Sequence, residues 1–174
     1  VLALDPNNEE ALRRSGRILF ATEKYEEALE IYSSILKANP GNTAALVDRS
    51  FCYEKLGQLS KAVADLTRAM ELDPTLTEKH KTVLAALYMQ RGSQFLEDGK
   101  WEDALADFKL AILADEDSRP DAEEAMATAY LKRAIQLLED EGPEVALADL
   151  NSCLLLRPED QQALRLRGGI HVQL

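Results

Sequence analysis

The sequence predicts an all-α protein, a right-handed α-solenoid of antiparallel helix pairs. Three observations lead to this prediction: a repeat with a spacing of 34 residues, an alanine at a matched place in each repeat, and a proline that ends most repeats. With 46% hydrophobic and 29% charged residues among 174, the chain has the composition of a folded domain. Its 31 acidic and 20 basic side chains give a net charge of −11, which argues against nucleic acid as a partner.

Prolines mark the ends of the repeats. Pro6, Pro40 and Pro74 close similar tripeptides and lie 34 residues apart. Twelve residues before a proline, or before Glu116 in one repeat, stands an alanine, and a large apolar residue follows four residues later. The alanines are Ala28, Ala62, Ala104 and Ala146, and the large residues are Tyr32, Leu66, Phe108 and Leu150. Because proline cannot continue the hydrogen-bond ladder of a helix, we expect a second helix to end before each of these positions.

A first helix precedes each of these second helices. The units begin at Glu9, Thr43, Ala85 and Ala127, with a partial unit from Gln161. Their eighth residue is small in every unit, namely Gly16, Ser50, Gly92, Ala134 and Gly168. Small residues let two antiparallel helices approach closely. We therefore expect eight full helices in four pairs, a helical stub at residues 1–4, a final helix from about Pro158, and no strand.

The third and fourth units are each eight residues longer than the first spacing. The added segments, Thr77–Leu84 and Arg119–Met126, continue the apolar stripe of the helices that follow them. We therefore predict long first helices from near Leu76 to Glu97 and from near Arg119 to Asp140. Thr75 with Glu78 has the spacing of a capping box, and Ser118 with Asp121 is a second candidate cap. The alternative is that both insertions are flexible surface loops.

This pattern of small, large apolar and proline positions resembles the tetratricopeptide repeat family over nearly the whole chain. The resemblance implies one repeat domain over residues 1–174 that is incomplete at both ends. Val1 falls at the twenty-seventh position of an earlier unit, and residues 161–174 supply only a first helix. We expect the full protein to carry further repeats. Exposed apolar ends of such a stack would also favour self-association.

The residues do not suggest catalysis. An enzyme needs a nucleophile with a base, paired carboxylates in a cleft, or a metal cluster, and none is visible in the sequence. Cys52 and Cys153 lie far apart, so neither a disulfide nor a zinc site is indicated, and we expect no metal and no cofactor. The apolar run at residues 83–89 is too short to cross a bilayer. The expected location is the cytoplasm, in a reducing environment.

The family resemblance implies that function depends on a concave groove lined by the first helices. The matched groove positions are basic at one end and apolar at the other. The candidate partner-binding residues are Arg13, Arg14, Arg17, Val47, Phe51, Met89, Leu131 and Ile135. We expect them to bind an apolar or amphipathic segment of another protein, a helix in a groove, and neither nucleic acid nor a membrane. For the apolar positions, the alternative is burial beneath a neighbouring repeat.

A protein-interaction scaffold or adaptor is therefore the predicted function. The alternative is a regulatory or substrate-docking arm of a larger enzyme. Some members of the family hold acidic C-terminal tails of heat-shock chaperones through lysine, arginine and asparagine side chains. The matching positions here are Arg13, Arg17, Asp48, Ala86 and Gln90, so the asparagines are missing and an acid faces the tail. We expect no binding of such a tail, because like charges repel.

Overall fold

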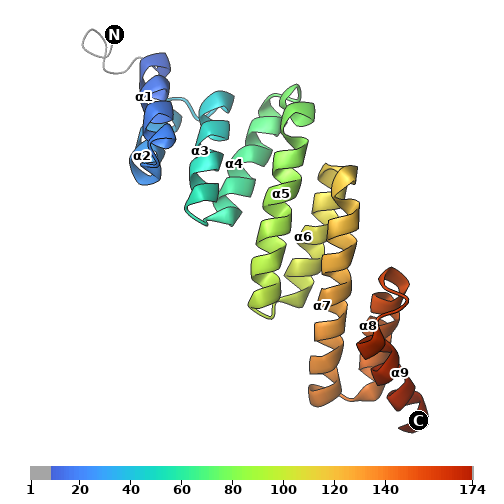
Figure 1. The fold of residues 1–174 in the computed structure, drawn as a ribbon. Helices are drawn as coiled ribbons and strands as arrows, with labels where there is room; N and C mark the ends of the chain where they lie inside the picture. Colours follow the sequence, from blue (N-terminus) through green and yellow to red (C-terminus); the bar gives the residue numbers. More distant parts are fainter. Residues whose placement is uncertain (1–8, 174) are drawn as a thin grey trace. The chain divides into compact units, whose positions relative to one another are not determined.

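The computed structural model describes residues 9–173, and within them every regular element is a helix (Figure 1). The order is α1 (Glu9–Ala21), α2 (Tyr25–Ala38), α3 (Thr43–Lys55), α4 (Leu59–Leu72), α5 (Leu76–Glu97), α6 (Trp101–Ala114), the short 3₁₀-helix η1 (Glu116–Ser118), α7 (Arg119–Asp140), α8 (Pro143–Leu156) and α9 (Gln161–Gln173). The all-α class with four helix pairs and a final helix is confirmed. The expected stub at residues 1–4 lies outside the described residues.

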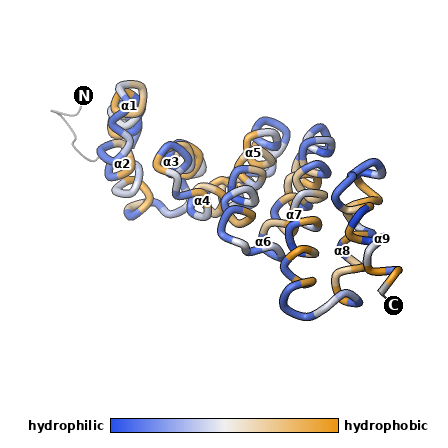
Figure 2. Tube along the Cα trace, turned by 60° about the horizontal axis from the view of Figure 1, so that its bottom comes forward, coloured by the Kyte–Doolittle hydropathy of each residue, from blue (hydrophilic) through white to orange (hydrophobic). Residues whose placement is uncertain are grey.

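The chain divides into two compact units, Val1–Leu87 and Tyr88–Leu174, and the division falls inside α5. Each unit is described by itself. The first contains α1 to α4 and the first turns of α5, and the second contains the last turns of α5 and α6 to α9. Hydrophobic and hydrophilic residues are mixed along every helix, as expected for helices that bury one side only (Figure 2).

In the first unit, α1 pairs with α2, α3 pairs with α4, and α2 also packs on α3. Gly16 shows why a small residue is needed at the eighth position, because a Cβ atom built there would lie 2.8 Å from a ring carbon of Tyr32. Tyr32 is buried against that glycine, and Ala28 and Ala62 are fully buried at the matched alanine positions. The predicted close approach of paired helices is therefore confirmed here.

The second unit repeats this packing. A Cβ at Gly92 would lie 2.7 Å from the ring of Phe108, and Ala104 and Ala146 are fully buried. Helix α7 contacts both α6 and α8, and α9 packs on α8. The aromatic ring seated on a small residue is thus a feature of both units.

A buried ion pair also recurs, and reasoning from the sequence missed it. In three of the four helix pairs an arginine of the first helix donates two hydrogen bonds to an aspartate sixteen residues later, with distances from 2.6 to 2.8 Å. The pairs are Arg49–Asp65, Arg91–Asp107 and Arg133–Asp149. Each guanidinium also lies over a tyrosine ring of its own helix. The recurrence of arginine and aspartate at fixed positions was the signal for this pair.

Helices α5 and α7 have the predicted bounds, and the loop alternative is wrong. Their starts differ from the expected caps. Ser118 makes no side-chain cap bond to α7, because its hydroxyl donates to the carbonyl oxygen of Asp115 at 2.7 Å. The hydroxyl of Thr75 donates to Asp73 Oδ1 at 2.6 Å, which orders the turn before α5. Both turns are therefore held by an aspartate that follows the preceding helix.

Candidate partner-binding site

Two cavities that share lining residues open in the first unit, between α1, α3 and the first turns of α5. The larger, of about 400 Å³, is lined by Arg13, Arg17, Thr43, Ala44, Val47, Asp48, Phe51, Leu76, Lys79 and His80. The smaller, of about 340 Å³, is lined by Arg17, Phe20, Ala21, Tyr32, Asp48 and Phe51. We call them together the α1–α3–α5 cavity. Arg17, Asp48 and Phe51 belong to both parts and form its centre.

The apolar part of the cavity comes mainly from α3 and α5. Val47 is buried and Phe51 is half-buried, and the Phe51 ring lies 6.3 Å from the ring of His80 at an angle of 55°. Burial, and to a smaller extent Lys79, lowers the pKa of His80. The imidazole is therefore neutral at pH 7 and contributes to the cavity as an aromatic ring.

The charged part is less basic than the sequence suggested. Arg13 Nε donates to Asp48 Oδ2 at 2.6 Å, and both side chains are partly buried, so the charge of Arg13 is already compensated. Arg17 and Lys79 are exposed, and neither forms an ion pair within residues 9–173. These two cations, from α1 and α5, are the ones that remain available to a ligand with a negative charge.

The nucleophilic groups next to the cavity are poor candidates for chemistry. Burial, and then the Asp48 carboxylate, raises the pKa of Tyr32 and raises the pKa of Cys52 to about 11. Burial likewise raises the pKa of Cys153 in the second unit. Both thiols are therefore protonated at pH 7. Within the described residues, no three side chains of His, Cys, Asp or Glu gather as a metal site would require.

Of the residues proposed from the sequence, Arg13, Arg17, Val47 and Phe51 come together in the cavity. Arg14 does not line it, because its side chain is exposed and its Nε donates to Glu10 at 3.0 Å along the same helix.

Sequence reasoning missed the contribution of α5. Matching by repeat position selected Ala86 and Gln90 for the third helix, but the residues that line the cavity are Leu76, Lys79 and His80. These residues lie two turns earlier on the same helix. The only available signal was the apolar stripe through Leu76 and His80 at the start of the insertion.

The proposed residues of the second unit are in a different situation. Met89 packs against the core cluster around Ala104 and Phe108, and Leu131 packs against the cluster around Ala127. Met89, Leu131 and Ile135 all remain partly exposed. For Met89 and Leu131, these contacts favour the alternative of a packing role.

The chain was compared with known proteins. Residues 15–86 match the family model described as tetratricopeptide repeat. Hsp70-Hsp90 organizing protein 3 from Arabidopsis thaliana is 39% identical over 74 residues, which are 42% of this chain and 13% of that protein. Dynein axonemal assembly factor 4 from Pongo pygmaeus is 32% identical over 94 residues, 53% of this chain and 22% of that protein. The chain thus spans only about an eighth to a fifth of the length of these relatives.

Two solved structures resemble this one in fold. The MamA protein matches with a TM-score of 0.51 at 18% identity, covering 94% of this chain and 81% of the other. A repeat protein from Bacteroides fragilis NCTC 9343 also has a TM-score of 0.51, at 17% identity, covering 99% and 87%. The predicted resemblance is confirmed: residues 15–86 are tetratricopeptide repeats, and the helix pairs of both units have the corresponding fold. Among the described residues, no helix is long and apolar enough to cross a membrane.

Proposed function

We propose that this chain is a protein-interaction module that docks a segment of another protein in the α1–α3–α5 cavity. The observation that carries the proposal is the meeting of an apolar surface, Val47 and Phe51, with two cations that have no ion-pair partner within residues 9–173, Arg17 and Lys79. An apolar surface with charged groups at its edge is typical of partner-binding sites. The relatives named Hsp70-Hsp90 organizing proteins, named for protein partners, support a protein ligand.

The chemistry of the cavity selects an amphipathic segment, and we propose a helix. Its apolar side would rest on Phe51, and an acidic side chain would approach Arg17 and Lys79. Such a charge pair at the edge of a contact raises the association rate and sets the orientation of the ligand more than it raises affinity. Met89, Leu131 and Ile135 remain candidate anchors for a contact with the second unit.

The expectation about acidic C-terminal tails now depends on Asp48 alone. Lys79, rather than Ala86, lines the cavity, so the third helix does supply a cation. Asp48 lines both parts of the cavity, however, and is held in place by Arg13. We propose that this carboxylate disfavours a free C-terminal carboxylate and that the ligand carries its acid on an internal side chain.

We infer a non-catalytic role, because the buried thiols near the cavity are protonated and unreactive at pH 7. We also propose a cytoplasmic location, which suits two free, buried cysteines. The net charge of −11 disfavours nucleic acid.

The experiment begins with a displayed library of amphipathic 16-residue peptides selected against the whole chain. The dissociation constant of a selected peptide is then measured with the wild type, Arg17→Glu and Arg14→Glu. Arg14→Glu is a matched control, since it makes the same charge change on the same helix outside the cavity. We expect Arg17→Glu to weaken binding about ten-fold, or ~1.4 kcal/mol, and Arg14→Glu to change it less than about two-fold. Equal affinities for all three proteins would place the binding site elsewhere.

A second titration tests the role of Asp48. A peptide that ends in acidic residues with a free carboxylate is compared with the same peptide carrying a C-terminal amide. We expect the wild type to bind neither form at low-micromolar concentration. We expect Asp48→Asn to gain affinity for the free acid. Low-micromolar binding of the free acid by the wild type, lost in Arg13→Ala, would contradict the proposal that Asp48 rejects it.

A further inference from the structure

Large apolar side chains reach solvent on the outward sides of α6 and α8 in the second unit. Leu113 of α6 is 81% exposed and Leu155 of α8 is 82% exposed. Leu110 and Val145 on the same two helices are also exposed. We call Leu110, Leu113, Val145 and Leu155 the outer leucine face. Their exposure means that these side chains do little for the core, so packing does not explain their apolar character.

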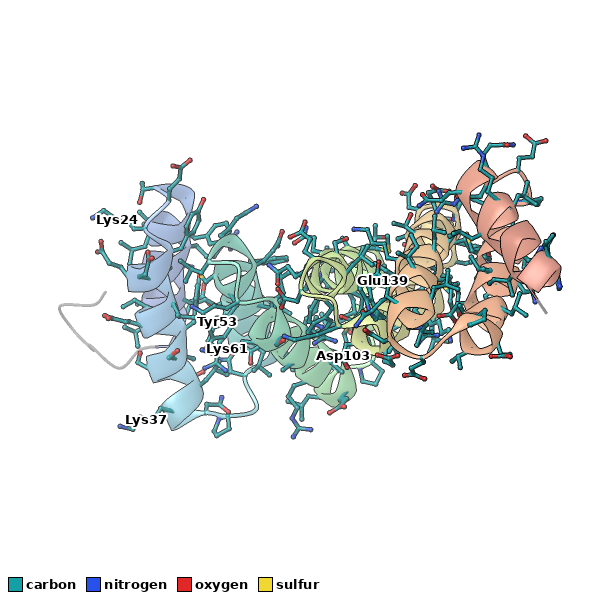
Figure 3. All side chains as sticks on the ribbon, turned by 90° about the horizontal axis from the view of Figure 1, so that it is seen from below. Lys24, Lys37, Tyr53, Lys61, Asp103 and Glu139 are labelled. Atoms are coloured by element: carbon teal, nitrogen blue, oxygen red, sulfur yellow. The ribbon has the colours of Figure 1, made fainter. Side chains whose placement is uncertain are left out.

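The first unit shows what the fold itself requires at these positions. Leu113 and Leu155 occupy the twenty-ninth position of their repeats, where the first unit has Lys37 and Glu71. Lys37 extends away from the ribbon of α2 (Figure 3). At the position of Leu110 the first unit has Ser34 and Arg68. Charged and polar residues are thus compatible with the helix pair, and the leucines of the second unit are a departure from its own repeat.

Charge distinguishes the two units in the same way. Residues 88–174 contain 18 acidic and 9 basic side chains, whereas residues 1–87 contain 13 acidic and 11 basic ones. Exposed acids lie before and after the leucines along the chain: Asp103 and Asp117 around Leu113, and Glu144 and Glu159 around Leu155. Lys109 is the one cation that α6 and α8 carry. The outer leucine face is therefore an apolar surface with an acidic border.

We propose that the outer leucine face docks a basic amphipathic segment of another protein. The apolar residues of that segment pack on Leu113 and Leu155, and its lysines or arginines meet the acids at the ends of α6 and α8. Complementary charge selects this occupant. A second copy of this unit would bring acid against acid, and an anionic lipid surface would be repelled by the same border. This surface is independent of the cavity in the first unit.

The test uses the whole chain and a defined probe, a fluorescein-labelled 18-residue peptide of leucine and lysine with leucines spaced for one face of a helix. A peptide of the same composition in scrambled order, without an apolar face, controls for charge alone. Binding is followed by fluorescence anisotropy with the wild type and with the double variant Leu113→Gln/Leu155→Gln, which leaves the charge unchanged. Ile18→Gln is the matched control, because Ile18 is also exposed, at 66%, and lies on α1 of the first unit.

We expect the wild type to bind the ordered peptide about ten-fold more tightly than the scrambled one, and the double variant to lose this preference. Ile18→Gln should retain it. Circular dichroism should show equal helix content in all three proteins, since Leu113 and Leu155 contribute little to the core. Equal affinity of the wild type and the double variant for the ordered peptide would overturn the proposal. So would a concentration-dependent dimer of the wild type that the double variant no longer forms, because it would show that a second copy covers the face.

Discussion

Replacing Asp107 by alanine tests whether the recurrent arginine–aspartate pair stabilises the helix pairs or merely fits into them. Asp107 is 3% exposed and receives two hydrogen bonds from Arg91, both 2.7 Å long. The variant leaves the guanidinium of Arg91, 18% exposed, without its counter-charge. Breaking a buried pair in this way costs roughly 3–5 kcal/mol. Because water still reaches part of Arg91, we expect a loss of about 2–3 kcal/mol in the free energy of unfolding.

The first helix pair supplies the matched control. At the two positions of the ion pair, α1 and α2 carry Ser15 and Ile31. The double variant Arg91→Ser/Asp107→Ile transfers this solution to α5 and α6. We expect the double variant to be more stable than Asp107→Ala by about 1 kcal/mol or more, because no buried charge is left unpaired.

Urea unfolding followed by circular dichroism measures both quantities, with the slope of the transition compared between variants. A loss below about 0.5 kcal/mol for Asp107→Ala, the size of a surface substitution, would refute the buried-pair reasoning. A double variant no more stable than the single one would show that Arg91 acts through its contact with the Tyr88 ring at 5.4 Å rather than through Asp107.

The remaining predictions concern glycines and a thiol. Gly92 and Gly168 occupy the same repeat position, but a Cβ at Gly168 meets no atom within 4 Å. Gly168→Ala should therefore stabilise by up to about 1 kcal/mol through helix propensity, whereas Gly92→Ala should destabilise by about 1–3 kcal/mol by displacing Phe108; thermal unfolding of both variants checks the opposite signs. Burial raises the pKa of Cys52 from 9.0 to about 11, so the folded state keeps its proton longer than the unfolded state. Stability should be unaffected by Cys52 below pH 9 and should fall between pH 9 and 11, and urea titrations at these pH values should show a smaller fall for Cys52→Ala.

Much of the fold was predictable because the signals are local. A proline stops a helix wherever it stands, and apolar residues at helical spacing define one side of a helix without reference to the rest of the chain. For this reason the bounds of α5 and α7, Leu76–Glu97 and Arg119–Asp140, agree with the sequence prediction. Ser118 is an exception, since its hydroxyl donates to a nearby carbonyl group instead of capping the helix.

Half of the proposed site was also predictable. Arg13, Arg17, Val47 and Phe51 lie on first helices of equal length spaced by 34 residues, so matching by repeat position found them. Arg14 was matched in the same way but does not line the cavity, because its side chain lies along α1 beside Glu10.

The sequence by itself determined where the helices begin and end, which residues seat the aromatic rings, and that the chain is built from tetratricopeptide repeats. Tertiary structure decided which side chains share the cavity. Lys79 lines it because the position of a long helix along its neighbour depends on packing, which repeat numbering does not encode. The pairing of Arg13 with Asp48, 35 residues apart, likewise depends on how α1 and α3 lie together. The pattern of helix formers and helix breakers is written in neighbouring residues, whereas partners across helices are chosen by distances that exist only after folding.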